Sequence, residues 1–256
     1  MNQEKAFENV SVVIITRNEE DNIGDCLESV KWAGEVIVVD SGSTDDTQDV
    51  CRQYGVAFHI EPWKGFSQQK NSAIEKATKP WVLSLDADER VTLPLKGEIG
   101  VILSDPDSKD GYFIKRKNFF LGKWIKHCGW YPDYNLRLFR RGKGSFGMRE
   151  VHESVDLDGP VGYLENPMEH HTYRSIDDFM GRLDRYSTLA ARELLKENRR
   201  YGMHHIIFRP IYTFFNMYIM RFGILEGYYG FILSVFYSFY TFSKYVKLRE
   251  LQDNRS

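Results

Sequence analysis

The chain has 256 residues, which is enough for one large domain or for a domain with a substantial appendage. Its 34 Lys and Arg residues nearly balance 36 Asp and Glu residues, so the overall charge indicates no nucleic acid partner. Three cysteines without C-x-x-C spacing argue against a disulfide framework or a zinc site. Because no apolar run follows the segment from Met1 to Lys5, we expect no signal peptide and a chain that stays in a reducing cytoplasm.

The N-terminal part alternates between strand and helix patterns. Continuous apolar runs of strand length occupy residues 11–16, 35–40, 56–60 and 81–85. Between the first two runs, apolar residues repeat at the spacing of one helix face, at Ile23, Cys26, Leu27 and Val30. Strands without polar alternation are typical of parallel sheets that are covered on both faces. The pattern therefore predicts a doubly wound, mostly parallel α/β domain.

Polar segments follow three of these strands. Thr16 to Glu19 follow the first strand, Asp40 to Asp45 the second, and Asp86-Ala87-Asp88 the fourth. Open α/β sheets bind ligands at the carboxyl ends of their strands, and carboxylates at i and i+2 lie on the same side of an extended chain. With a phosphorylated substrate, such a pair could hold Mg²⁺ or Mn²⁺. Taken alone, the D-x-D pattern would favour an acidic surface turn, but the preceding segments favour a ligand site.

The C-terminal half is less regular. Strand patterns at 111–117 and 137–140 enclose a basic and aromatic stretch, and helical periodicity returns between residues 175 and 200. We expect residues 1–174 to form the α/β domain and residues 175–256 a helical C-terminal region. The apolar segment 222–242 is interrupted by Glu226 and falls short of a membrane crossing. Its basic flanks favour helices that lie in the membrane interface; the alternative is an oligomer interface or a helix pair covering the domain.

Several motifs carry a family resemblance. Ile15 to Glu19, Val39 to Asp45, Lys70-Asn71 and Leu85 to Asp88 together resemble the nucleotide-sugar half of family 2 inverting glycosyltransferases, which have the GT-A fold. The later motifs resemble the bacterial lipopolysaccharide-core β-glucosyltransferase branch: Gly129 to Asp133, Arg137 to Arg140, Val151-His152-Glu153 and His170 to Tyr173.

The resemblance implies a nucleotide-sugar donor at the strand ends. Asp40 would accept a hydrogen bond from the N3–H group of uracil, and Thr16 and Arg17 would line the base. Glu19 would bind ribose hydroxyls, and Asp86 would lie near the ribose. The full set of expected donor-binding residues is Thr16, Arg17, Glu19, Asp40, Ser41, Lys70, Asp86 and Ala87.

The resemblance also implies a divalent metal, Mn²⁺ or Mg²⁺, that bridges the donor phosphates. Asp88 would reach this metal, whose charge stabilises the departing diphosphate. His170 resembles a C-terminal histidine that joins metal or diphosphate binding; a structural histidine is the alternative. Lys70 would neutralise phosphate unless it is a solvated helix lysine.

The general base and the acceptor site are expected in the C-terminal half. Motif order favours Glu153 as the base that deprotonates the acceptor hydroxyl, and Asp133 is the alternative. Aromatic faces stack on sugars and arginines bind phosphate or carboxylate, so the expected acceptor-binding residues are Trp130, Tyr131, Arg137 and Arg140. The alternative is a solvated basic hairpin whose aromatic residues lie in the core.

The sequence therefore predicts an inverting, metal-dependent glycosyltransferase that moves a hexose, expected to be glucose, from a UDP-sugar. The expected acceptor is an anionic glycolipid or oligosaccharide of the lipopolysaccharide core or a similar envelope glycan. We expect a cytoplasmic protein on the inner face of the membrane, with a homo-oligomer through the C-terminal helices as a further expectation and no nucleic acid partner. The alternatives are a protein or peptide acceptor, or a non-catalytic carbohydrate- or lipid-binding protein. The position of D-x-D after the fourth strand disfavours a haloacid dehalogenase-type phosphatase, and the lack of a Gly-rich basic loop after the first strand disfavours a nucleotidyltransferase.

Overall fold

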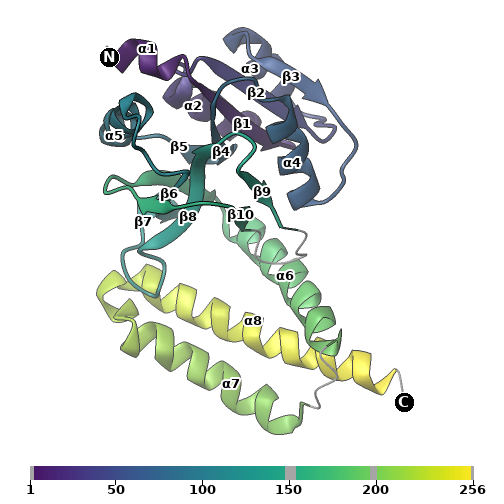
Figure 1. Ribbon diagram of the computed structural model, residues 1–256. Coiled ribbons are helices and arrows are strands. Elements are labelled where there is room, and N and C mark those ends of the chain that lie inside the picture. The colour runs from purple at the N-terminus through teal and green to yellow at the C-terminus, as the bar shows by residue number, and fades with distance from the viewer. Residues whose placement is uncertain (1–2, 148–153, 197–200, 255–256) are drawn as a thin grey trace. The chain divides into compact units, whose positions relative to one another are not determined.

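The computed structural model describes residues 3–147, 154–196 and 201–254 (Figure 1). The chain forms two compact units. The sheet unit comprises Met1–Arg116 and Asp133–His170, and the helical unit comprises Lys117–Pro132 and His171–Ser256. The segment 117–132 thus belongs with the C-terminal helices. The expected division into residues 1–174 and 175–256 places this segment in the α/β domain instead.

The sheet unit contains most of the regular elements. Its helices are α1 (Gln3–Phe7), α2 (Glu20–Val30), α3 (Thr47–Tyr54), α4 (Phe66–Lys76) and α5 (Leu93–Ser104). Its strands are β1 (Val10–Thr16), β2 (Glu35–Asp40), β3 (Ala57–Ile60), β4 (Trp81–Asp86), β5 (Glu89–Arg90), β8 (Asp133–Arg140), β9 (Gly144–Phe146), β10 (Val155–Leu157) and β11 (Val161–Tyr163). Two further strands, β6 (Gly111–Phe120) and β12 (Met168–Tyr173), continue from this unit into the helical unit.

The main sheet has the strand order β3-β2-β1-β4-β8-β6-β12-β5. The first four strands are parallel, and β8 then pairs with β4 and β6 in antiparallel fashion. Thr16 pairs with Asp40 in the register of β1 and β2, and Ile15 pairs with Asp86 in that of β1 and β4. The register therefore places the polar ends of β1, β2 and β4 side by side. The predicted mostly parallel α/β sheet is confirmed.

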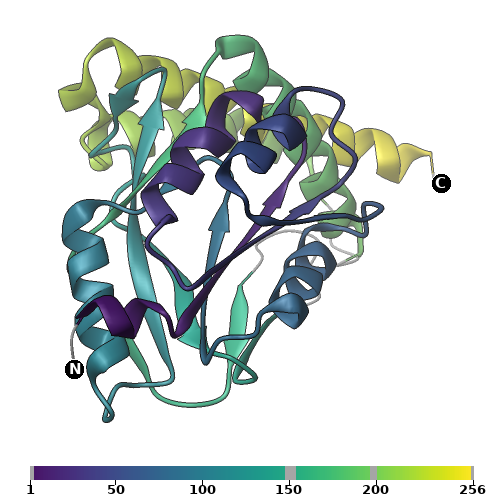
Figure 2. The same ribbon diagram turned by 90° about the horizontal axis from the view of Figure 1, so that it is seen from above.

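Strand β1 is buried along its whole length because helices cover both faces of the sheet. Val10, Val12 and Ile14 belong to the larger core, which includes the apolar faces of α2 and α5. Val13 and Ile15 belong to a second core that includes Ala73 of α4. This alternation follows from the period of two in a strand. The helix α5 was not predicted from the sequence; α1 packs against it, as the turned view shows (Figure 2).

The helical unit contains β7 (Lys123–Trp124), α6 (Ile176–Lys196), α7 (Met203–Phe215), a π-helical segment η1 (Asn216–Met220), a 3₁₀ segment η2 (Gly223–Glu226) and α8 (Tyr228–Asp253). Helix α8 packs against both α6 and α7 (Figure 1). The core of the unit gathers aromatic residues from separate elements, among them Phe120, Trp130 and Phe179. Within the described ranges, no helix combines the length and the apolar character needed to cross a membrane. The predicted helical C-terminal extension is confirmed.

Candidate active site

The ends of β1 and β2 form a tight polar junction. The backbone N–H of Ser41 donates to the carbonyl of Thr16 at 3.0 Å, which holds the two strand ends together. Asp40 is buried, and its Oδ1 accepts the backbone N–H groups of Gly42 and Ser43, both at 2.8 Å. The hydroxyl of Ser43 donates to the other carboxylate oxygen. Asp40 therefore shapes its own turn, which the positive φ of Gly42 permits, and its carboxylate still has lone pairs for a further donor.

Two buried hydroxyl groups lie at this junction. The side-chain oxygens of Thr16 and Ser41 are buried and make no hydrogen bond within the part of the chain that the structure describes. The amide of Gln69, in the first turns of α4, is likewise fully buried without a described partner. A buried polar group left unpaired costs about 1–3 kcal/mol, so such groups are expected where a ligand completes the hydrogen bonding. The junction of β1 and β2 has the polar character of a binding site.

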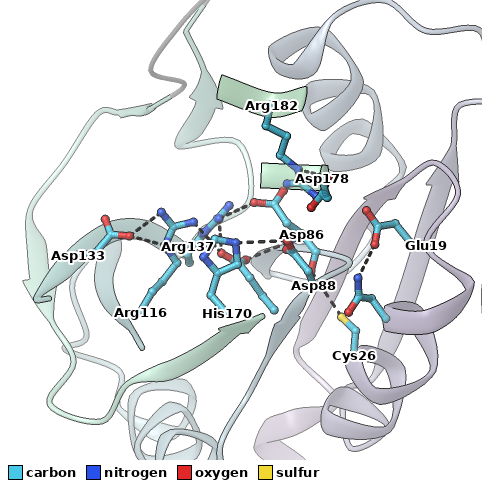
Figure 3. A network of polar contacts seen from close by, with 12 residues as sticks. Glu19, Cys26, Asp86, Asp88, Arg116, Asp133, Arg137, His170, Asp178 and Arg182 are labelled. Carbon is cyan, nitrogen blue, oxygen red and sulfur yellow. Dashed lines mark hydrogen bonds and ion pairs between the residues drawn. The ribbon is translucent and has the colours of Figure 1, made fainter. Parts of the chain in front are cut away.

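At the end of β4, Asp86 is held by two cations, of which Figure 3 shows Arg137. Lys70 of α4 lies 2.8 Å from Oδ1, and Nη2 of Arg137 donates to Oδ2 at 2.8 Å. Burial alone would raise the pKa of Asp86, but the charges of Lys70 and Arg137 outweigh it and hold that pKa well below its usual range. Asp86 is thus ionised, and Lys70, whose side chain is 8% exposed, is not a solvated helix lysine.

A second carboxylate, Glu89, extends these ion pairs into a buried network. Glu89 is fully buried, and its Oε1 accepts Nη2 of Arg137 at 2.6 Å and Nη1 of Arg116 at 3.1 Å. Its other oxygen accepts the backbone N–H of Asp86 at 2.9 Å. Arg116 continues to Asp133, to which Nη2 and Nε donate at 2.6 and 2.9 Å. We call this set the ion network: Lys70, Asp86, Glu89, Arg116, Asp133 and Arg137.

Sequence reasoning missed Glu89 and Arg116. Glu89 directly follows the D-x-D motif, and this third acid in sequence was the available signal. Arg116 lies between Lys115 and Lys117 on a strand, where nothing in the sequence distinguishes it from its neighbours. Only the antiparallel pairing of β6 and β8 brings Arg116 opposite Asp133.

Asp88 lies outside the ion network and faces His170. The two side chains approach to 3.4 Å, between Oδ2 of Asp88 and Nε2 of His170, and both are largely buried (Figure 3). The pairing of β12 with β5 sets His170 opposite Glu89 and so beside the D-x-D motif. Among the described residues, no three His, Cys, Asp or Glu side chains group as a metal site. A carboxylate and an imidazole nevertheless fit the donor types that a divalent ion such as Mn²⁺ accepts, so Asp88 and His170 would be the residues to hold one.

The remaining expected donor residues surround the strand ends. Arg17 is exposed, directly after β1. Glu19 precedes α2, where its carboxylate accepts the side-chain amide of Asn22 at 2.7 Å. Ala87 is buried between the two aspartates. Glu153 lies outside the residues that the structure describes.

The structure separates the expected acceptor residues. Arg137 is 4% exposed and belongs to the ion network. Arg140 pairs in register with Trp81, at the opposite end of β4 from Asp86, and its guanidinium lies over the Trp81 ring at 4.6 Å. In the helical unit, Trp130 lies in the aromatic core, and the Tyr131 ring meets Trp124 edge-on at 5.5 Å.

Comparison with known proteins assigns a family to this arrangement. Residues 11–145, which include the ends of β1, β2 and β4, match the model described as Glycosyl transferase family 2. The chain belongs to this family. A lipopolysaccharide core biosynthesis glycosyltransferase, LpsC of Rhizobium meliloti, is 32% identical over 251 residues, covering 92% of this chain and 91% of the relative. An uncharacterized glycosyltransferase of Rickettsia typhi is 30% identical, covering 94% of this chain and 87% of the relative.

Solved structures similar to the chain include two bacterial proteins. One is S. aureus TarS 1-349 in complex with UDP-GlcNAc, at 16% identity and a TM-score of 0.49, covering 88% of this chain and 79% of TarS. Another is glucosyl-3-phosphoglycerate synthase of Mycobacterium tuberculosis with Mn²⁺ and UDP, at 25% identity and a TM-score of 0.35, covering 47% of each chain. The family assignment rests on the family model and the full-length relatives. The chain is a glycosyltransferase, and the predicted family and GT-A fold class are confirmed.

Proposed function

We propose that this family 2 glycosyltransferase moves a hexose, with glucose as the expected sugar, from a UDP-sugar to a lipopolysaccharide-core or similar envelope glycan, with inversion. The observation that carries the proposal is the pair of buried hydroxyls of Thr16 and Ser41, which have no partner among the described residues, beside the carboxylate of Asp40. The name of the LpsC relative supports the lipopolysaccharide core as the acceptor class. A protein or peptide acceptor is the alternative within the same chemistry.

The strand ends suit a nucleoside diphosphate because they offer a carboxylate acceptor and hydroxyl groups side by side. Asp40 offers an acceptor for the N3–H of uracil, and the two hydroxyls offer partners for the base or the ribose. Arg17, which is exposed directly after β1, lines the base, and the carboxylate of Glu19 accepts hydrogen bonds from the ribose hydroxyls. Asp86 is fixed by the ion network, so its position beside the ribose is set before the donor binds.

Asp88 and His170 are the residues that would hold Mn²⁺ or Mg²⁺. A bound divalent ion would supply positive charge for the diphosphate leaving group. Asp88 is not one of the carboxylates of the ion network, in which Lys70, Arg116 and Arg137 pair with Asp86, Glu89 and Asp133.

The general base is Glu153 in this proposal. Asp133, the alternative, already accepts two hydrogen bonds from Arg116, which occupy the carboxylate that a general base would turn toward the acceptor hydroxyl. The base removes the proton of the acceptor hydroxyl as the sugar's anomeric carbon is attacked. Tyr131 is proposed to contact the acceptor, for which a position on the inner face of the cytoplasmic membrane would be natural.

The first experiment measures UDP release from a panel of UDP-sugars, with Mn²⁺ or Mg²⁺ and with EDTA. Wild type is compared with Asp88→Ala and with Asp107→Ala, a control that removes an exposed carboxylate far from the D-x-D motif in sequence. Loss of several kcal/mol of charge stabilisation should slow release about a thousandfold in Asp88→Ala. EDTA should have the same effect on the wild type, and the control should match the untreated wild type.

The outcomes separate the rival functions. Metal-dependent release of UDP from one donor would support the proposal and name the sugar. A protein that binds glycans but neither binds nor turns over any UDP-sugar would favour the non-catalytic alternative. Full activity of Asp88→Ala would remove Asp88 from the metal site.

A further inference from the structure

Helix α7 is rich in apolar residues, and most of its large apolar side chains are exposed. Of its 13 residues, Pro210 is the one that is buried. Six large apolar residues on this helix are exposed: Met203, Ile207, Phe208, Ile211, Tyr212 and Phe215. Large exposed apolar surfaces are rare on soluble monomers and mark interaction sites or membrane contacts.

The apolar surface continues through the turn and along α8. In the turn, Phe222 and Leu225 are 60% and 67% exposed. On α8, exposed apolar residues recur at intervals of three or four, which defines one stripe along the helix: Tyr228, Phe231, Val235, Phe239, Phe242 and Val246. Because α7 and α8 pack against each other, the two helices and their turn form one element, residues 203–253, that we call the hairpin.

The exposed carboxylates of the hairpin, Glu250 and Asp253, lie at the C-terminal end of α8. Between Tyr201 and Arg249 the sequence has a single acidic residue, Glu226. Glu226 is buried, and its carboxylate accepts Nζ of Lys123 at 3.0 Å, the ring of His127 at 2.7 Å and the backbone N–H of Lys126 at 2.9 Å. Its charge is therefore compensated inside the helical unit.

Cationic groups border the apolar surface. Arg209 on α7 and Arg221 in the turn are exposed. Beside the first turns of α7, a pocket is lined by His204, His205, Phe208, Arg209 and Tyr212. Two imidazoles and a guanidinium next to aromatic rings suit the phosphate of a lipid headgroup.

We propose that the hairpin docks in the surface of an anionic lipid bilayer, with its apolar stripe among the acyl chains and its cations at the headgroups. This composition matches that of interfacial helices, which are rich in aromatic residues and attracted to anionic lipid. A second copy of this chain fits less well. A two-fold interface would bring the cations of both copies into one contact surface, whereas the exposed carboxylates of the hairpin, Glu250 and Asp253, lie only at the end of α8, where Asp253 already pairs with Arg249.

The test uses the full-length chain and sedimentation with vesicles, with no sugar donor present. One set of vesicles is phosphatidylcholine alone, and the other contains phosphatidylglycerol. Leu225→Glu and Phe208→Glu place a charge on the turn and on α7. Leu93→Glu is the matched control, because Leu93 is 83% exposed in the sheet unit.

Wild type should sediment with the anionic vesicles. Each hairpin variant should bind them at least about tenfold more weakly, because a charged group replaces an apolar side chain that would otherwise be buried in the bilayer. Arg209→Gln should lose about fivefold on anionic vesicles and little on neutral ones. Leu93→Glu should bind like the wild type, and circular dichroism should show every variant folded.

Three results would overturn the proposal. One is wild type that stays in solution with both kinds of vesicle, and another is equal binding by wild type and both hairpin variants. The third is a wild type that does not sediment with vesicles and forms a dimer that Leu225→Glu dissociates. This result would assign the surface to a second copy of the chain. Because no donor is used, vesicle binding by a protein that neither binds nor turns over any UDP-sugar would count against the proposed function and leave this inference intact.

Discussion

The two units depart in opposite ways from the usual rule that charged side chains are exposed and apolar side chains are buried. The sheet unit buries charge, since Glu89 and Arg137 are 0% and 4% exposed. The helical unit exposes apolar side chains, most of all on α7. Buried charges are tolerated when each is paired and hydrogen-bonded, and an exposed apolar surface is tolerated when something covers it in use. The comparison teaches that one unit compensates its buried charges internally, whereas the other leaves an apolar surface for which we have proposed a lipid bilayer as the cover.

The ion network shows how internal compensation works. Each carboxylate meets at least one guanidinium or ammonium group, and Glu89 also receives a backbone N–H. Such an arrangement adds little net stability compared with apolar packing, but it fixes geometry. Here it fixes Asp86, the first residue of the D-x-D motif, and Glu89, which follows the motif, so Asp88 lies between two fixed positions.

The largest expected effect is on kcat. It tests whether Asp133, a carboxylate of the ion network, also acts as the general base. Glu153→Gln should keep donor binding and lower kcat by about 10²–10⁴-fold, the range for a lost general base. Asp133→Asn should lower kcat less, because Arg116 already engages that carboxylate. Steady-state UDP release and donor titration would measure both. The reverse ranking would assign the base to Asp133 and give the ion network a direct catalytic role.

The next largest effect is on the free energy of unfolding, and it comes from removing one charge of the ion network. Glu89→Gln leaves Arg116 and Arg137 without their shared carboxylate and should cost about 3–5 kcal/mol in the free energy of unfolding. Urea denaturation would measure it. Glu28→Gln is the control, since Glu28 forms an exposed ion pair with Lys31 and should change stability by less than about 1 kcal/mol. A loss below 1 kcal/mol in Glu89→Gln would mean that the network does not depend on this residue.

The smallest effect concerns the buried carboxylate of the helical unit. Burial would raise the pKa of Glu226, but Lys123, His127 and the backbone N–H of Lys126 hold it below the usual 4.5. Because the folded pKa is the lower one, its stabilising contribution is present above pH 4.5 and is lost as the pH falls through the folded value. Glu226→Gln should therefore cost about 1–3 kcal/mol at pH 7.

Thermal or urea unfolding across the acid range would follow this difference between wild type and Glu226→Gln. It should shrink as the pH falls below 4.5, the ordinary carboxyl value. A difference that stays constant with pH would show that Glu226 acts through packing rather than charge. Vesicle binding should be unchanged in the variant, because Glu226 is not exposed on the hairpin.

Much of this protein could be predicted from its sequence because the relevant signals are local. Apolar runs predicted β1, β2, β3 and β4, and the polar residues at their ends predicted which edge of the sheet matters. These follow from strand periodicity and from the rule that parallel strands bring their carboxyl ends to one edge. The family followed from the same motifs.

Other features depended on contacts between distant segments. Arg137 and Arg140 look alike in sequence, yet one lies under Asp86 and the other over Trp81, since β8 runs antiparallel to β4. Trp130 looked like a sugar platform and lies in a core. The sequence by itself determined the strands, their polar ends and the family. Tertiary structure alone decided which charges are buried together, because ion pairing depends on the register of strands far apart in the chain.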